Sequence, residues 1–231
     1  MRGVTVAAIA VGAFFAVLGA ASERLATIWP ADEASGRGPG GRTVLLAAAA
    51  GAAGWGIAAR STLDWWATVV HLALLALLVV LSATDLEQRR LPHLVLDPLI
   101  LLAIAFVPFN PAVEPISALA GAAVAVGFLG LLGILVRAGV AMGDLYLVAP
   151  LGLLLGWPAI FVAVFLAALL SAATSIVLLA SRRVGLKSYI PFGPFLVAGA
   201  VLTLLRDPAL LGPPGEVAAH AVNLLVRGLG G

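Results

Sequence analysis

The sequence predicts an all-α integral membrane protein, a single bundle of about eight transmembrane helices. Of its 231 residues, 62% are hydrophobic and only 10% are charged, and the mean hydropathy is +1.14. A soluble domain carries about 25% charged residues. A chain of this composition cannot bury its apolar side chains in one water-soluble core, so the number of membrane spans decides the architecture.

Six segments meet the length and composition of a membrane span. A spanning helix needs ~20 mostly apolar residues. The segments are 4–22, 43–59, 64–83, 93–108, 115–137 and 190–206. The first of them resembles a signal peptide, because Arg2 precedes the apolar run. We expect it to stay as an uncleaved first span, because only then do the later segments give a coherent topology.

The segment 144–181 contains no charge except Asp144 and is either one very long helix or two helices. The second alternative places a turn at Gly156, Trp157 and Pro158. Short cytoplasmic loops are enriched in Lys and Arg. Two crossings put nine of the thirteen basic residues on one side, whereas one crossing puts six there. Charge asymmetry therefore predicts spans at 143–156 and 158–181, with the N-terminus outside.

The remaining features exclude several kinds of site and partner. The chain has no cysteine, which excludes disulfides, thiolate zinc sites and a cysteine nucleophile. Its three histidines show no metal-ligand spacing, and its arginines are dispersed, so we expect no metal site and no nucleic-acid partner. The apolar residues of 214–229 fall on one face of a helix. This pattern predicts an interfacial tail helix that lies against membrane lipid. The whole chain, 1–231, is then one membrane domain.

Two carboxylates stand out from the solvated loop charges. Asp85 follows the third span and Asp144 opens the sixth, so the topology places both at the same depth on the cytoplasmic side. Two carboxylates that face each other share one proton, because like charges in contact do not both ionise easily. One can then take a proton from water while the other polarises a scissile carbonyl. This is aspartic-protease chemistry, and it needs neither metal nor cofactor.

Two other roles for these aspartates remain open on position alone. An ion- or proton-coupled carrier also uses intramembrane carboxylates, although its site is expected near the midplane on broken helices. A purely structural role has Asp144 capping its helix and Asp85 paired with a nearby arginine.

Four segments, in chain order, resemble motifs of the type IV prepilin peptidase (prepilin leader peptidase) family, which are GxGD-type intramembrane aspartic proteases. The segments are "GAFFAVLGAASERLATIWP", "TDLEQRRLPH" with "LVLDPLI", "AMGDLYLVAPLGLLLGW", and "SYIPFGPFLVAGA". The resemblance implies a bacterial inner-membrane endopeptidase with Asp85 and Asp144 as its catalytic pair. Its partners would be type IV pilus or protein-secretion precursors, which carry a short basic leader before a hydrophobic helix and are cut at the cytoplasmic face. A catalytically silent homologue that only binds a pilin-like helix is the alternative.

Further residues are expected to shape this site. Charge complementarity suggests that Glu87 and Asp97 steer a basic leader. Gly143 would let the backbone at Asp144 approach its partner closely. By their position in the motifs, the remaining candidates are Pro92, Pro191, Phe192, Gly193 and Pro194.

The chain departs from the family pattern at several points. Ala141 replaces the first glycine of GxGD, Tyr146 stands where a lysine is usual, and His93 stands where Asp or Asn commonly follows Leu-Pro. Only "ADEASGRGPGGR" occupies the place of a cytoplasmic domain with paired cysteines. The N-methyltransferase activity of bifunctional members is therefore not assigned. No S-adenosylmethionine site can be identified in the loops, so we expect no cofactor.

Overall fold

The structure, a computed structural model, describes residues 2–30, 37–135, 141–182 and 190–212. These ranges contain eight α-helices, two short 3₁₀ turns and no strand. The predicted all-α membrane bundle is therefore confirmed. The expected tail helix at 214–229 lies outside the described residues.

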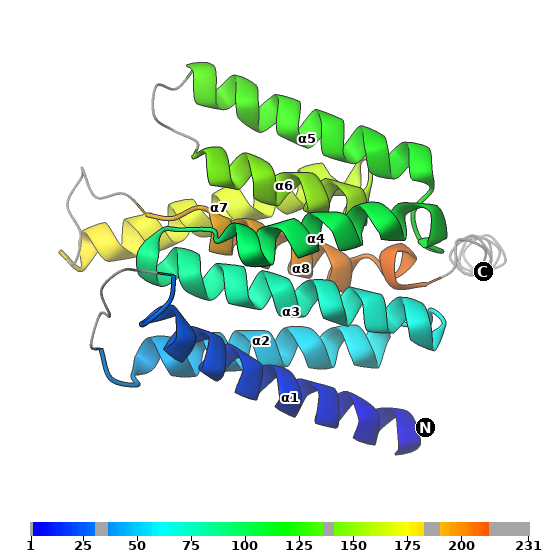
Figure 1. The fold of residues 1–231 in the computed structure, drawn as a ribbon, viewed down its shortest axis with the longest axis horizontal. Helices are drawn as coiled ribbons and strands as arrows, with labels where there is room; N and C mark the ends of the chain where they lie inside the picture. Colours follow the sequence, from blue (N-terminus) through cyan, green and yellow to red (C-terminus); the bar gives the residue numbers. More distant parts are fainter. Residues whose placement is uncertain (1, 31–36, 136–140, 183–189, 213–231) are drawn as a thin grey trace, which may run out of the picture.

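The helices lie side by side and reverse direction at each connection (Figure 1). Their bounds are α1 Arg2–Ala26, α2 Gly41–Arg60, α3 Trp65–Gln88, α4 His93–Phe106, α5 Pro115–Leu135, α6 Met142–Leu155, α7 Ala159–Ala180 and α8 Gly193–Arg206. The 3₁₀ turns η1 (Val107–Phe109) and η2 (Pro208–Leu211) follow α4 and α8. Because α3 continues to Gln88, beyond the expected 64–83, Asp85 lies inside its last turn.

Helix length divides the bundle into two groups. α1, α2, α3, α5 and α7 are long and apolar enough to cross a membrane. α4, α6 and α8 have 14 residues each. At 1.5 Å per residue, each of these three is about 21 Å long, shorter than the ~30 Å hydrocarbon core. Of the three, α6 is mostly buried within the bundle, whereas half of the residues of α4 are exposed.

The segment 144–181 contains two helices, α6 and α7. Gly156 ends α6 with a φ of 69°, a left-handed conformation that favours glycine. The turn that follows is fixed to the start of α5, because the Trp157 N–H donates to the Ser117 carbonyl over 3.0 Å. The Ser117 hydroxyl donates in return to the Trp157 carbonyl over 2.8 Å.

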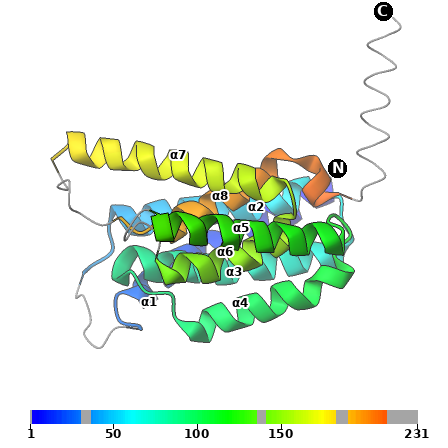
Figure 2. The same cartoon turned by 90° about the horizontal axis from the view of Figure 1, so that it is seen from above.

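Four helices close a ring in the order α3, α4, α6, α8. α3 packs against α4 and α8, and α6 packs against the same two helices. α1 and α2 pack together and cover α3, α5 covers α6, and α7 covers α8. Figure 2 shows α4 and α7 on opposite sides of the bundle. The ring is thus the centre of the molecule, and three of its four members are the short helices.

An ion-pair network holds the chain before α2 to α1 and α3. We call it the Glu23 network, after the buried Glu23, which is 5% exposed. Arg37 lies 2.5 Å from the Glu23 carboxylate and 2.7 Å from that of Glu87. Arg42 also pairs with Glu87 over 3.0 Å, and the Thr43 hydroxyl donates to Glu23 over 2.8 Å. The network joins three segments that lie far apart in the sequence.

Close backbone contact replaces large side chains where α7 meets α8. A methyl group on Gly199 would overlap the Ala163 carbonyl oxygen and would lie 2.9 Å from the Ala167 nitrogen. Small residues at such a contact let two helices approach closely, which is how helices associate in lipid. Gly199 is therefore a packing position of the bundle.

We predict that Arg37→Ala lowers stability by about 2 kcal/mol. This loss of stability lies between the losses expected for an exposed ion pair and for a fully buried one, because Glu23 is buried while the Arg37 side chain is 36% exposed. Thermal unfolding in detergent should show a Tm lower by ~6 °C. Arg206→Ala, which removes an exposed arginine at the other end of the bundle, is the matched control and should leave Tm unchanged. Equal Tm values for the two variants would contradict a structural role for the network.

We predict that Gly199→Ala lowers stability by about 1–3 kcal/mol, because the added methyl group meets backbone rather than a movable side chain. Gly127→Ala is the matched control, since nothing lies within 4 Å of the methyl group there. Alanine favours a helix over glycine by up to about 1 kcal/mol, so this control should be neutral or stabilising. The same unfolding measurement compares the two, and a harmless Gly199→Ala would refute the close contact.

Candidate active site

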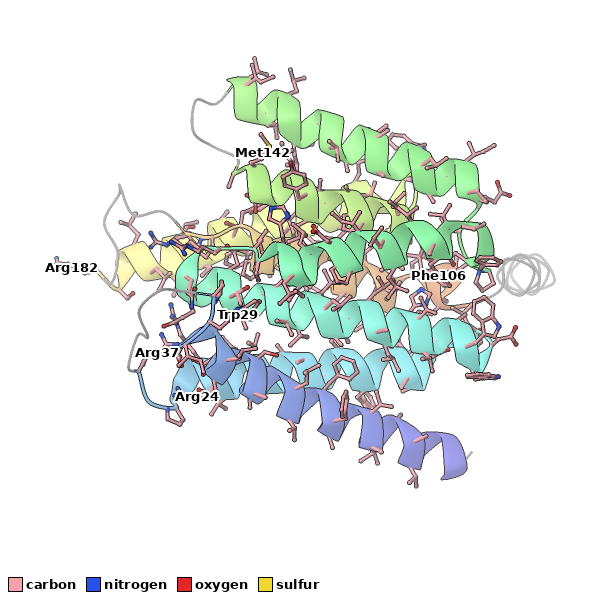
Figure 3. All side chains as sticks on the ribbon, in the orientation of Figure 1. Arg24, Trp29, Arg37, Phe106, Met142 and Arg182 are labelled. Atoms are coloured by element: carbon pink, nitrogen blue, oxygen red, sulfur yellow. The ribbon has the colours of Figure 1, made fainter. Side chains whose placement is uncertain are left out.

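The two singled-out aspartates lie at the same end of the helix ring. Asp85 is in the last turn of α3 and is 7% exposed; Asp144 is in the first turn of α6 and is 4% exposed. Figure 3 shows Met142, the first residue of α6, at the end that also holds Arg24 and Arg37, with Phe106 at the opposite end. Both side chains are buried.

The two carboxylates belong to diagonally opposite helices of the ring. Asp85 lies close enough to Asp144 to be affected by its charge. α3 and α6 supply one aspartate each, and α4 and α8 form the other two sides of the ring. Tertiary structure therefore brings together two residues that are 59 positions apart in the sequence.

The Asp144 carboxylate is oriented by the start of its own helix. The Ala141 N–H donates to Asp144 Oδ2 over 3.3 Å, and the Asp144 N–H donates to the Ala141 carbonyl over 3.0 Å. An acid in the first turn accepts from otherwise unpaired amides and complements the helix dipole. The structural role expected for Asp144, that of the N-cap, therefore belongs to Ala141. Asp144 is the third residue of α6, and its carboxylate is oriented by the N-cap amide.

The Asp85 carboxylate is buried without a complete set of partners. Its Oδ2 atom has no hydrogen-bond partner among the described residues. The backbone of Gly193 lies directly against it, since a methyl group on Gly193 would lie 2.6 Å from this oxygen. The positive charge of Arg89, one turn later, also acts on the carboxylate. Buried polar atoms are nearly always paired, and an orphaned one is a feature of functional sites.

The segment before α8 delivers Gly193 to Asp85. Pro191 is buried, and Phe192 precedes Gly193, the first residue of α8. Pro194 is the second residue of that helix, where its missing N–H costs nothing. Three of the four residues expected to shape the site here therefore set the start of α8, and the fourth, Gly193, contacts the aspartate.

The connection from α3 to α4 touches the start of α6. Pro92 follows Leu91 and is the last residue before α4, where its backbone is extended. A methyl group on Gly143 would lie 3.0 Å from Leu91 Cδ1. Gly143 thus makes room for Leu91, and the glycine that lies against an aspartate of the pair is Gly193.

The two acids expected to steer a leader have different surroundings. The Glu87 side chain is 8% exposed and pairs with Arg37 and Arg42 in the Glu23 network. The Asp97 side chain is 62% exposed and lies 3.1 Å from His93 Nδ1. Of the two, only Asp97 presents a carboxylate to an incoming peptide.

His71 lies apart from the aspartate pair. Its Nδ1 bonds to the Ala67 carbonyl over 2.8 Å, and its ring meets Phe106 edge-on at 5.3 Å. The hydrogen bond lies within α3, and the ring contact joins α3 to α4. Within the part of the chain that the structure describes, no group of three or more His, Asp or Glu residues could hold a metal ion.

The Gly193 contact was not identified from the sequence as a contact with Asp85. The "PFGPF" string marked the segment as important, but only its place at the start of α8 set Gly193 against the carboxylate. The Ala141 amide was missed for the same reason, because alanine has no polar side chain to attract attention.

Known proteins are similar to this chain over the region that contains the site. Residues 72–176 match the sequence profile of the type IV leader peptidase family. The chain is 33% identical over 159 residues to "Prepilin leader peptidase/N-methyltransferase" of Aeromonas salmonicida (strain A449), covering 65% of this chain and 54% of that protein.

Two further relatives carry the same name. The protein of Bacillus subtilis (strain 168) is 28% identical over 144 residues, covering 59% of this chain and 55% of that protein. The protein of Burkholderia pseudomallei (strain 1026b) is 32% identical over 143 residues, covering 60% and 46%. The chain thus spans about half the length of the curated relatives it matches. No solved structure matches it.

The matched profile includes both Asp85 and Asp144. Together with the membrane-helix architecture and the several relatives of one name, this match supports the type IV leader peptidase, or prepilin peptidase, family for this chain.

Proposed function

We propose that the chain is a membrane aspartic endopeptidase that removes the short basic leader peptide from type IV pilin-like precursors. Asp85 and Asp144 form its catalytic pair. The family match and the names of its relatives support the class of reaction. The observation that carries the proposal is the buried Asp85 carboxylate, whose Oδ2 lacks a partner while its charge interacts with that of Asp144.

A structural role alone does not account for this arrangement. A buried charge is costly unless it is paired and hydrogen-bonded. Asp144 accepts a hydrogen bond from the Ala141 amide. The Gly193 backbone and the charge of Arg89 act on Asp85. One Asp85 oxygen nevertheless lacks a partner, and the charge of Asp144 acts on the same carboxylate. An apolar residue at 85 would fill the same space without that cost. In a pair that holds one proton, the unpartnered oxygen and the nearby second carboxylate both have a use in catalysis.

The reaction follows from a pair that holds one proton. The ionised carboxylate takes a proton from a water molecule, whose oxygen attacks the scissile carbonyl carbon. The protonated partner donates a hydrogen bond to the carbonyl oxygen as negative charge develops there, and it keeps its proton. When the tetrahedral intermediate collapses, the C–N bond breaks, and the carboxylic acid that took the water proton passes it to the leaving amine. The products are the free leader and a new N-terminus on the apolar helix, and the pair again holds one proton.

The positions of the arginines support a cytoplasmic location of the site. The end of the bundle that holds the aspartates carries Arg24, Arg37, Arg42, Arg89, Arg90 and Arg182. The opposite end carries Arg2, Arg60 and Arg206 among the described residues. Basic residues concentrate in cytoplasmic loops. We therefore place the site at the cytoplasmic face of a bacterial inner membrane, with the N-terminus outside and lipid around the long helices.

We predict that Asp85→Asn and Asp144→Asn each abolish leader removal, by at least about a thousandfold, because neither variant retains a pair that can both take and give a proton. Each variant is co-expressed with a pilin-like precursor, and the precursor mass is measured. Asp64→Asn, which changes an exposed acid at the other end of α3, is the matched control and should process normally. Retained processing in either pair variant would falsify the assignment. Precursor binding without cleavage by the unmodified chain would indicate a silent homologue instead.

We predict that Gly193→Ala lowers the processing rate by about a hundredfold. The added methyl group would lie 2.6 Å from Asp85 Oδ2 and would displace the carboxylate, and misplacement of a reacting group by about 1 Å can cost that factor. Gly127→Ala serves as the control in the same assay. Normal processing by Gly193→Ala would mean that the Asp85 position does not limit the reaction.

A further inference from the structure

At the end of the bundle that carries the aspartate pair, most of the acids that the structure describes are paired or buried. Six arginines lie there, as described above. Glu23 and Glu87 are neutralised inside the Glu23 network, and Asp85 and Asp144 are buried. Among the described acids at this end, Asp97 is the one whose side chain remains exposed. A basic peptide that approaches this end meets an exposed carboxylate at Asp97, which attracts it.

Two rings lie beside Asp97. His93, one turn earlier on α4, holds its Nδ1 3.1 Å from Asp97 Oδ1. The His93 ring meets that of Tyr146, on α6, edge to face, with centroids 5.9 Å apart and an angle of 71° between the planes. Tyr146 is 47% exposed. A carboxylate and half-exposed aromatic rings at one place form a favourable site for an ammonium or guanidinium group.

The cluster lies next to the catalytic pair. Tyr146 follows Asp144 by two residues, a rise of about 3 Å along α6. Asp144 points into the helix ring and is buried, whereas Tyr146 lies on the outer side. A cation held by the cluster would therefore sit on the rim of the site, at a fixed distance from the reacting carboxylates.

We propose that Asp97, His93 and Tyr146 form a subsite that binds a basic side chain of the leader and so sets which peptide bond reaches Asp85 and Asp144. The identity of this ligand rests on the proposed function. His93 orients the Asp97 carboxylate, and Tyr146 supplies the aromatic face.

The subsite also gives a role to the residue at position 146. A lysine there, as the family pattern leads one to expect, would place a cation beside the His93–Asp97 pair and would compete with the substrate for Asp97. Tyrosine leaves that carboxylate available. Tyr146→Lys should therefore weaken the preference for a basic leader, even though it changes no residue of the catalytic pair.

Binding of two labelled peptides tests the subsite separately from cleavage. Both peptides have an apolar segment of about twenty residues; one carries a leader with two lysines, and the other has glutamines in their place. The full chain with Asp85→Asn is used in non-ionic detergent, so that the peptide stays intact and no lipid cation competes. Fluorescence anisotropy should give a Kd about tenfold lower for the lysine peptide, as one partly desolvated cation site can provide.

In that background, Asp97→Asn and Tyr146→Lys should each reduce the tenfold preference to about twofold or less. Asp64→Asn removes the same charge from the other end of the bundle and should leave the preference unchanged. No preference for the lysine peptide, or a preference that survives Asp97→Asn, would overturn the subsite. If the preference depends on Asp97 but the unmodified chain cleaves neither peptide, the subsite stands and the proposed peptidase activity fails.

Discussion

The contact between the Asp85 carboxylate and the Gly193 backbone is the constraint on which the site depends. Only a residue without a side chain fits there, because a methyl group would lie 2.6 Å from Oδ2. The contact requires α8 to begin at this point, after the proline-rich segment from Pro191, and requires α3 to continue to Gln88. The ring of α3, α4, α6 and α8 then encloses two carboxylates that α3 and α6 carry.

Close backbone packing supports this ring from outside. Lipid tails are as apolar as leucine, so helices in a membrane associate through tight fit rather than by expelling water. Gly199 sets α8 against α7, and a methyl group on Gly152 of α6 would lie 2.5 Å from Ala122 Cα of α5. The outer helices α5 and α7 thus each fix one member of the ring. The short helices α6 and α8 have these contacts, and neither is long enough to cross the hydrocarbon core alone.

The charged residues at the end of the bundle that holds the aspartates include a paired network and an exposed acid. The Glu23 network neutralises its own acids and ties the chain before α2 to α1 and α3, close to the end of α3 that carries Asp85. Arg37 and Arg42 are neutralised together with these acids, and Asp97 remains as the exposed acid among the described residues at this end. A stabilising network therefore also shapes the field that a charged peptide meets. Glu87, which sequence position made a candidate for steering, belongs to the stabilising part.

Composition determined the class of this protein, because a chain with 62% hydrophobic and 10% charged residues has no soluble alternative. Charge asymmetry predicted two helices in 144–181, and local strings singled out Asp85 and Asp144. The physical reason is that hydropathy and loop charge are local properties, readable over one span. Tertiary structure alone decided that Gly193 lies on Asp85, that Glu87 is neutralised, and that His93 meets Tyr146. These contacts join residues far apart in sequence, and they depend on helix order and rotation about the ring, which no single segment encodes.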